Sequence, residues 1–134
     1  MRPEIIHLIN EGTRDQILIG LKSLRNLLSK ENNPPIQEVI NAGLVERLVE
    51  LLESKHNTII YESTWALTNI TSGDTVQTQY VVKAGVIPKL VKLISSTNLD
   101  TCENAIWTLG NIAGDNSECR DLVIENKALE AISK

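Results

Sequence analysis

The chain has 134 residues, of which 42% are hydrophobic, and its formal net charge is −4. This is the length of one ordinary domain, and the hydrophobic content suffices for a packed interior and is too high for a disordered chain. We predict no nucleic-acid partner, because proteins that bind nucleic acid carry basic patches and this chain is mildly acidic.

No apolar run approaches the length of a membrane span, and charged residues interrupt the N-terminal stretch MRPEIIHLINEG. We therefore predict no membrane partner and no secretory signal. The two cysteines, Cys102 and Cys119, are too few for a disulfide scaffold and lack the spacing of metal ligands. We expect no cofactor, no metal site and no catalytic residue.

Apolar residues recur at three- and four-residue spacing almost throughout the chain, which predicts helices and no strand. A first short helix is expected to end near Gly12, and Thr13 or Asp15 could cap the second. The segment 31–35 is predicted to be a turn, because its second proline disfavours helical geometry at the first.

Two three-helix units are predicted after this turn. The expected helices are 35–42, 44–54 and 57–72 in one unit, and 75–84, 86–96 and 99–114 in the next. Gly43 and Gly85 stand at the joint between the first two helices of each unit, where glycine permits the left-handed backbone that turns one helix sharply into another.

The two units correspond at an offset of 42 residues, which places Trp65 on Trp107 and Asn69 on Asn111. The same offset pairs Gly43 with Gly85, Leu48 with Leu90, Arg47 with Lys89 and Leu67 with Leu109. A period of about 40–47 residues indicates a helical solenoid of the armadillo or HEAT kind. Such arrays curve to form an extended concave surface.

Each tryptophan precedes its asparagine by four residues, so the two side chains are expected on one helical face. We call Trp65, Asn69, Trp107 and Asn111 the Trp–Asn ladder. An asparagine amide can donate to a peptide carbonyl and accept from a peptide N–H. Parallel indoles would leave slots for lysine or arginine stems. Alternatively, the tryptophans could belong to the core and the asparagines could link neighbouring helices.

The stretches YESTWALTNITSG and ENAIWTLGNIAGD resemble importin-α, a family of armadillo-repeat nuclear import adaptors. LRNLLSKENNPPIQEVINAGLV is similar to the junction of that family's first two repeats, and CRDLVIEN resembles the opening of the fourth. The resemblance covers nearly the whole chain. It implies an adaptor that shuttles between cytoplasm and nucleus.

The period and the resemblance together predict an all-α fold, a right-handed armadillo-repeat α-solenoid of three-helix repeats in a single array. The expected boundaries are 1–34 for a capping-like first repeat, 35–74, 75–116, and 117–134 for a truncated fourth. Leu24 and Leu28 stand near the ladder places in the first unit. Because the last unit lacks its third helix, we expect a fragment whose exposed apolar end could drive self-association.

The resemblance implies that lysine- and arginine-rich nuclear localisation signals bind in extended form along the third helices. It assigns the ladder to the peptide and Asp115 to the key lysine of the signal, although Asp115 could instead cap a following helix. The full predicted peptide-binding set is Trp65, Asn69, Gly73, Thr78, Asn104, Trp107, Asn111, Asp115 and Ser29.

Several departures from the family pattern bear on this expectation. Thr71 replaces an alanine, Asn104 replaces a glutamine, and a third Trp–Asn pair would lie beyond Lys134. We therefore expect reduced affinity for the signal. The basic N-terminal segment that binds importin-β is not in the sequence, so importin-β is a partner only if the full-length protein carries such a segment.

Two rival functions predict different features. A generic armadillo scaffold for another extended partner, such as an acidic segment, would need a basic surface. The third helices of the two units carry Glu62, Glu103 and Asp100, and the lysines of 56–114 lie outside them. A thiol hydrolase would need a base beside its cysteine, and the only histidines belong to earlier units. We therefore predict a binding module and no enzyme.

Overall fold

The computed structural model describes residues 3–29, 34–96 and 98–115, and all regular structure in those ranges is helical. The helices are α1 (Pro3–Glu11), α2 (Arg14–Leu28), α3 (Ile36–Asn41), α4 (Leu44–Leu51), α5 (Asn57–Ile70), α6 (Thr75–Lys83), α7 (Val86–Ile94) and α8 (Leu99–Asp115). The predicted all-α array is confirmed. The expected fourth unit, 117–134, lies outside the described residues. None of the described helices is long and apolar enough to cross a bilayer.

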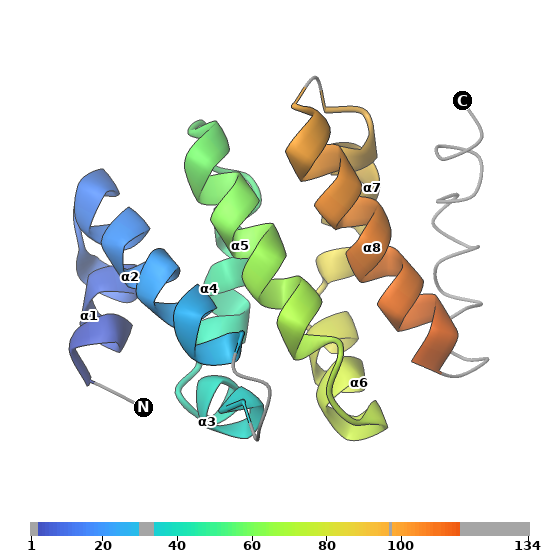
Figure 1. Ribbon diagram of the computed structural model, residues 1–134, viewed down its shortest axis with the longest axis horizontal. Coiled ribbons are helices and arrows are strands. Elements are labelled where there is room, and N and C mark those ends of the chain that lie inside the picture. The colour runs from blue at the N-terminus through green and yellow to red at the C-terminus, as the bar shows by residue number, and fades with distance from the viewer. Residues whose placement is uncertain (1–2, 30–33, 97, 116–134) are drawn as a thin grey trace.

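The helices form a repeating stack. α2, α5 and α8 lie side by side across one face and run in the same direction, with the shorter helices behind them (Figure 1). The starts of α4 and α7 are 42 residues apart, and so are the starts of α5 and α8. The sequence period therefore corresponds to one step along the stack, as in a solenoid.

The turns between helices follow the local signals in the sequence. Gly43 and Gly85 have φ angles of 76° and 88°, in the left-handed region, at the α3–α4 and α6–α7 joints. Of the two candidate caps for α2, Thr13 is the one used: its side chain accepts from the Gln16 backbone N–H, in a reciprocal capping box. Asp74 caps α6 in the same way.

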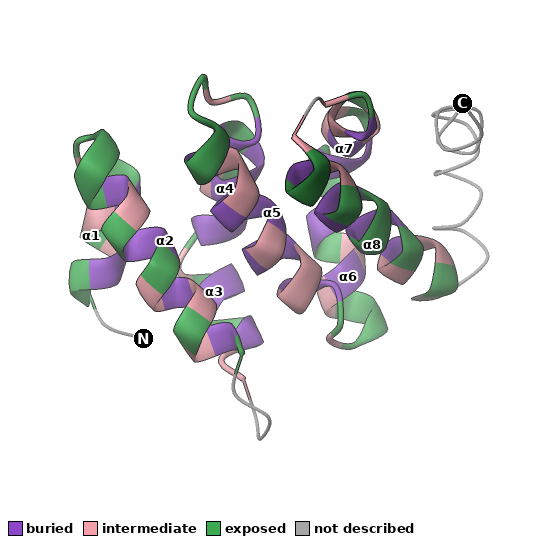
Figure 2. Cartoon of the chain, turned by 45° about the horizontal axis from the view of Figure 1, so that its top comes forward, coloured by how far each residue is buried: buried purple, intermediate pink, exposed green. Residues whose placement is uncertain are grey.

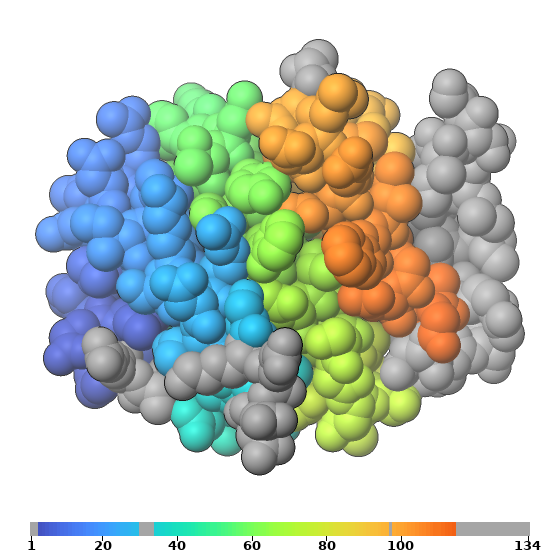
Figure 3. All heavy atoms as spheres, in the orientation of Figure 1, coloured from blue at the N-terminus to red at the C-terminus, as the bar shows by residue number. Residues whose placement is uncertain are grey.

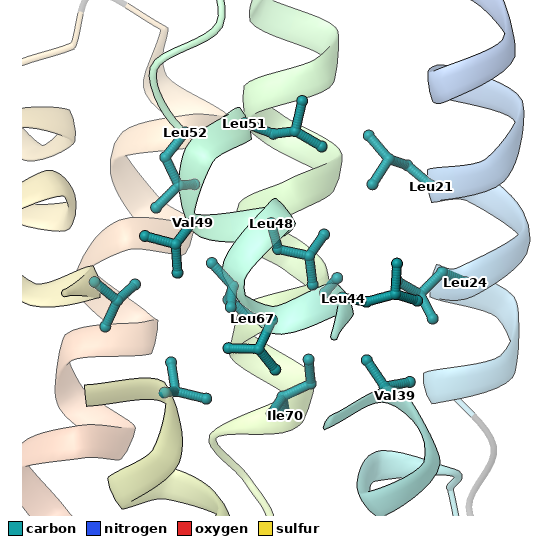
Figure 4. Packing of buried hydrophobic residues seen from close by; sticks show 14 of the residues in the cluster. Leu21, Leu24, Val39, Leu44, Leu48, Val49, Leu51, Leu52, Leu67 and Ile70 are labelled. Atoms are coloured by element: carbon teal, nitrogen blue, oxygen red, sulfur yellow. The ribbon is translucent and has the colours of Figure 1, made fainter. Parts of the chain in front are cut away.

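A single apolar core runs behind the face formed by α2, α5 and α8. Leu21 and Leu24 of α2 lie opposite Leu44 and Leu48 of α4, with Leu67 of α5 beside them (Figure 4). Leu24 is fully buried. In the first unit, therefore, this leucine belongs to the core and not to the surface on which the tryptophans of later units stand.

Polar side chains tie each unit to the one before it. Arg47 on α4 donates from Nε to the Ile9 carbonyl over 3.1 Å, and its repeat counterpart Lys89 on α7 donates from Nζ to the Val49 carbonyl over 3.4 Å. Both bonds reach carbonyls in the last turn of a helix, where the regular intrahelical donors run out. Tyr80 of α6 also donates to Glu46 of α4, and this bond raises the pKa of the Tyr80 phenol.

Replacement of Gly43 tests the left-handed joint. A Cβ at this position would meet no heavy atom within 4 Å, so the cost of Gly43→Ala is conformational only. We expect a loss of about 1–2 kcal/mol in the free energy of unfolding by urea titration. Gly43→Asn is the control, because asparagine enters the left-handed region more readily, and it should lose less. Equal stability of Gly43→Ala and the parent would contradict this account.

Candidate peptide-binding surface

The predicted ladder lies on the face formed by α2, α5 and α8, which we call the third-helix surface. Figure 3 shows the three helices as one continuous surface, coloured blue, green and orange. Trp107 is 61% exposed and Trp65 is half-buried. Figure 2 shows α8 presenting exposed residues on this side, whereas α5 shows mainly buried and half-buried ones. Neither indole therefore belongs to the core, which was the alternative left open by the sequence.

A pocket of about 50 Å³ lies between α5 and α8 on this surface, and we call it the indole pocket. Its lining residues are Trp65, Thr68, Asn69, Asn104 and Trp107. Four of the nine predicted site residues therefore meet at one place, although they come from helices whose starts are 42 residues apart.

Three buried nitrogen atoms around the indole pocket have no hydrogen-bond partner among the described residues. They are Trp65 Nε1, Asn69 Nδ2 and Asn104 Nδ2. Each of these atoms is an N–H donor, and buried polar atoms are normally paired. Residues that line the pocket thus carry several donors without a partner among the described residues.

The second ladder asparagine has a different role. Asn111 donates from Nδ2 to the Thr68 carbonyl over 3.2 Å and to Thr71 Oγ1 over 3.4 Å. These bonds link α8 to the end of α5. Thr71, the departure from the family pattern, supplies one of the two acceptors. Asn111 therefore links neighbouring helices, whereas the Asn69 amide nitrogen does not.

A threonine pair that the sequence did not predict also bridges α5 and α8. The hydroxyls of Thr68 and Thr108 lie 2.6 Å apart, and Thr108 donates to the Asn104 carbonyl over 2.8 Å. The two threonines are 40 residues apart, so the 42-residue offset of the repeat does not pair them. Their bridge holds the two walls of the indole pocket in register.

The largest addition to the predicted site is an ion pair between α2 and α5. Arg25 donates from Nη1 to both carboxylate oxygens of Glu62, over 3.1 and 3.2 Å, and its guanidinium carbon lies 5.5 Å from the centroid of the Trp65 ring. Glu62 is only 3% exposed. Glu62 therefore adds no open negative charge to this surface, because it is buried and paired with Arg25. The search for basic residues over 56–114 also leaves out Arg25, which belongs to α2 and contributes a cation to this surface.

Three further predicted contact residues lie outside the indole pocket. Ser29 is exposed at the end of α2, where its hydroxyl donates to the Arg25 carbonyl over 2.7 Å. Gly73 lies in the turn between α5 and α6. Thr78 on α6 is fully buried, and its hydroxyl donates to the Thr71 carbonyl over 3.3 Å.

Asp115 is the last residue of α8, and its side chain lies outside the described part of the structure. Its predicted pairing with a lysine of the peptide stays a prediction. The other acidic residues predicted on this helix, Asp100 and Glu103, are both exposed.

A larger pocket, of about 340 Å³, lies where α2 and α5 begin, and it contains none of the predicted site residues. Charges of both signs line it, with Arg14 Nε 3.7 Å from the Asp15 carboxylate. Within 3–29, 34–96 and 98–115 no three His, Cys, Asp or Glu side chains are grouped to hold a metal ion. The indole pocket is smaller, but it is the one that brings the predicted residues and the unpaired donors together.

Comparison with known families agrees with this geometry. The armadillo/beta-catenin-like repeat family matches residues 32–72 and 74–114, which together make up more than half of the chain. The chain therefore belongs to the armadillo-repeat class of proteins.

Individual relatives narrow this class. The chain is 44% identical to importin subunit alpha-2 of Caenorhabditis elegans over 125 residues, which are 93% of this chain and 24% of that protein. It is 48% identical to importin subunit alpha-2 of Arabidopsis thaliana over 128 residues, or 95% of this chain and 24% of that protein. The chain belongs to the importin-α family, as its sequence predicted, and spans about a quarter of the length of these relatives. The family consists of importin subunits and not of enzymes.

Solved structures show the same architecture. A designed armadillo repeat protein in complex with the peptide (KR)4 superimposes with a TM-score of 0.90 at 32% identity, over 96% of this chain and 54% of that one. Computationally designed armadillo repeat proteins for modular peptide recognition give a TM-score of 0.89 at 29% identity, over 96% of this chain and 54% of that one.

The two ladder asparagines form a matched pair for a stability test. Asn111→Ala removes a link between α8 and α5, and we expect it to lower the free energy of unfolding by about 0.5–1.5 kcal/mol. Asn69→Ala removes an amide nitrogen that has no partner in the described structure, so we expect a smaller loss. Urea titration of both variants measures the difference. A larger loss for Asn69→Ala than for Asn111→Ala would contradict the assigned roles.

Proposed function

We propose that the chain is part of a nuclear import adaptor and binds lysine- and arginine-rich nuclear localisation signals in extended form across the third-helix surface. The observation that carries this proposal is the set of unpaired donors around the indole pocket, Trp65 Nε1, Asn69 Nδ2 and Asn104 Nδ2. An extended peptide presents a regular series of carbonyl oxygens, and each new hydrogen bond contributes about 0.5–1.5 kcal/mol.

Backbone bonds hold a peptide without reading its sequence, so selectivity rests on side chains. Trp65 and Trp107 both border the indole pocket, and a lysine or arginine over an indole gains about 0.5–1 kcal/mol when exposed. Asp100 and Glu103 are exposed on α8, which adds negative charge on the Trp107 side. The comparison with a designed armadillo protein whose peptide is (KR)4 supports a basic ligand.

The remaining contacts are proposed from the family resemblance. Asp115, at the end of α8, is proposed to pair with the key lysine of the signal. Ser29 and Gly73 are proposed to border the peptide at its flanks. Thr78 is not included, because its side chain is fully buried. Asn111 can add a contact only through groups that its link to α5 leaves unused.

The setting of this activity also follows from the family. We propose that the full-length protein shuttles between cytoplasm and nucleus, and that importin-β binds it if it carries a basic N-terminal segment. Self-association through the apolar residues of 117–134 stays a prediction, because that segment lies outside the described residues.

The alternative is an armadillo scaffold for a different extended partner. Arg25 gives this alternative a cation on the third-helix surface that the sequence did not predict there. Its charge is neutralised by Glu62, however, so the surface does not become a basic one. A basic peptide is therefore favoured over an acidic one.

Peptide titration tests the proposed function directly. A fluorescein-labelled lysine-rich peptide should bind the chain, and its affinity should fall as salt rises, because screening weakens charge pairs at the surface. An acidic peptide of the same length is the control and should not bind. Tighter binding of the acidic peptide would favour the alternative scaffold.

Charge reversal at the end of α8 tests the role of Asp115. We expect Asp115→Lys to weaken binding of the lysine-rich peptide by at least about tenfold, because it replaces an attractive charge pair by a repulsive one. Glu53→Lys, on an exposed residue that follows α4, makes the same change in net charge and serves as the control. Equal effects of the two variants, with unchanged helical circular dichroism, would remove Asp115 from the site.

A further inference from the structure

The Trp65 ring already has a cation beside it in the free protein. The Arg25 guanidinium carbon lies 5.5 Å from the ring centroid, within the range of a cation–π contact. Arg25 is not among the lining residues of the indole pocket, which lies between Trp65 and Trp107. The ring therefore contacts an internal arginine from α2 as well as bordering the pocket toward α8.

This arginine is held in place and is not a freely moving surface side chain. Its Nη1 contacts both carboxylate oxygens of Glu62, which is 3% exposed. Arg25 itself has a side chain that is 35% exposed. Loss of Arg25 would leave a buried carboxylate unpaired, so the folded chain strongly favours the arginine at this position.

A guanidinium over an indole is the arrangement that a basic residue of a bound peptide would adopt. Since Arg25 takes that position, a peptide cation approaching from the α2 side would find this ring face already occupied by a guanidinium. Basic side chains of a ligand are thus directed to the indole pocket, where no described arginine or lysine lines the wall.

We propose that Arg25 is a specificity-determining residue. It occupies the cation position over Trp65 with a side chain of the protein itself, so the α2 side of that ring does not select a basic residue of the peptide. This inference rests on the proposed function, because it concerns which residues of a basic peptide are read. Glu62 acts as a positioning residue that holds Arg25 over the ring.

Removal of Arg25 is then a gain of function. In Arg25→Ala, the ring face and the Glu62 carboxylate become available to an arginine supplied by the peptide. The test uses a labelled peptide with the core Lys-Lys-Arg-Lys between Gly-Ser flanks, and two longer versions with one arginine added before or after the core. Fluorescence anisotropy gives the dissociation constant of each peptide for each chain.

In the parent chain we expect either added arginine to change the dissociation constant by less than about twofold. In Arg25→Ala we expect one of the two extensions to tighten binding about fivefold or more, the size of a single cation–π contact. Lys22→Ala is the matched control, because it removes one positive charge from an exposed site on the same helix. It should shift all three peptides alike and leave their ratios unchanged.

The double variant Arg25→Ala/Glu62→Gln covers the case in which Arg25→Ala does not fold, because it leaves no unpaired buried charge. It should retain a gain of about twofold to threefold from the ring alone. If the parent binds the core peptide and neither variant gains more from an extension than Lys22→Ala does, the role of Arg25 is overturned and the proposed function stands. If the parent does not bind the core peptide, the proposed function fails, and this inference fails with it.

Discussion

The packing of α5 between α2 and α8 is the constraint on which the rest of the surface depends. α5 packs against both neighbours, and two of its buried residues, Ser63 and Ala66, are small enough for helices to approach closely. Once the three helices are held parallel, side chains at equivalent places of the repeat stand at a regular spacing. A rigid, regularly spaced surface suits an extended peptide, because little ordering is needed on binding.

The polar residues of this surface divide into two groups by their partners. One group links helices: Asn111 with Thr68, and Arg25 with Glu62. The other group, which includes Asn69, keeps buried donors without a partner in the described structure. The first group is already satisfied before a ligand binds, and the second group gains hydrogen bonds only from a ligand. The hydrogen bonds that link the helices and the donors that lack a protein partner thus belong to different residues of one surface.

Much of the fold could be predicted because its signals are local. Helices follow from the spacing of apolar residues, the sharp joints from Gly43 and Gly85, and the solenoid from the offset between Trp65 and Trp107. The predicted helix ends differ from the observed ones by up to about three residues, since helix ends depend on individual capping bonds.

The candidate site was predicted only in part. Sequence alone determined that a tryptophan and an asparagine share one face of α5 and one face of α8, because the four-residue spacing is a property of a single helix. Only the tertiary structure decided that Asn111 is used to link helices, that Thr78 is buried, and that Arg25 reaches Glu62 and Trp65 from another unit. These outcomes depend on which residues of adjacent helices face each other, and no spacing within one helix encodes that.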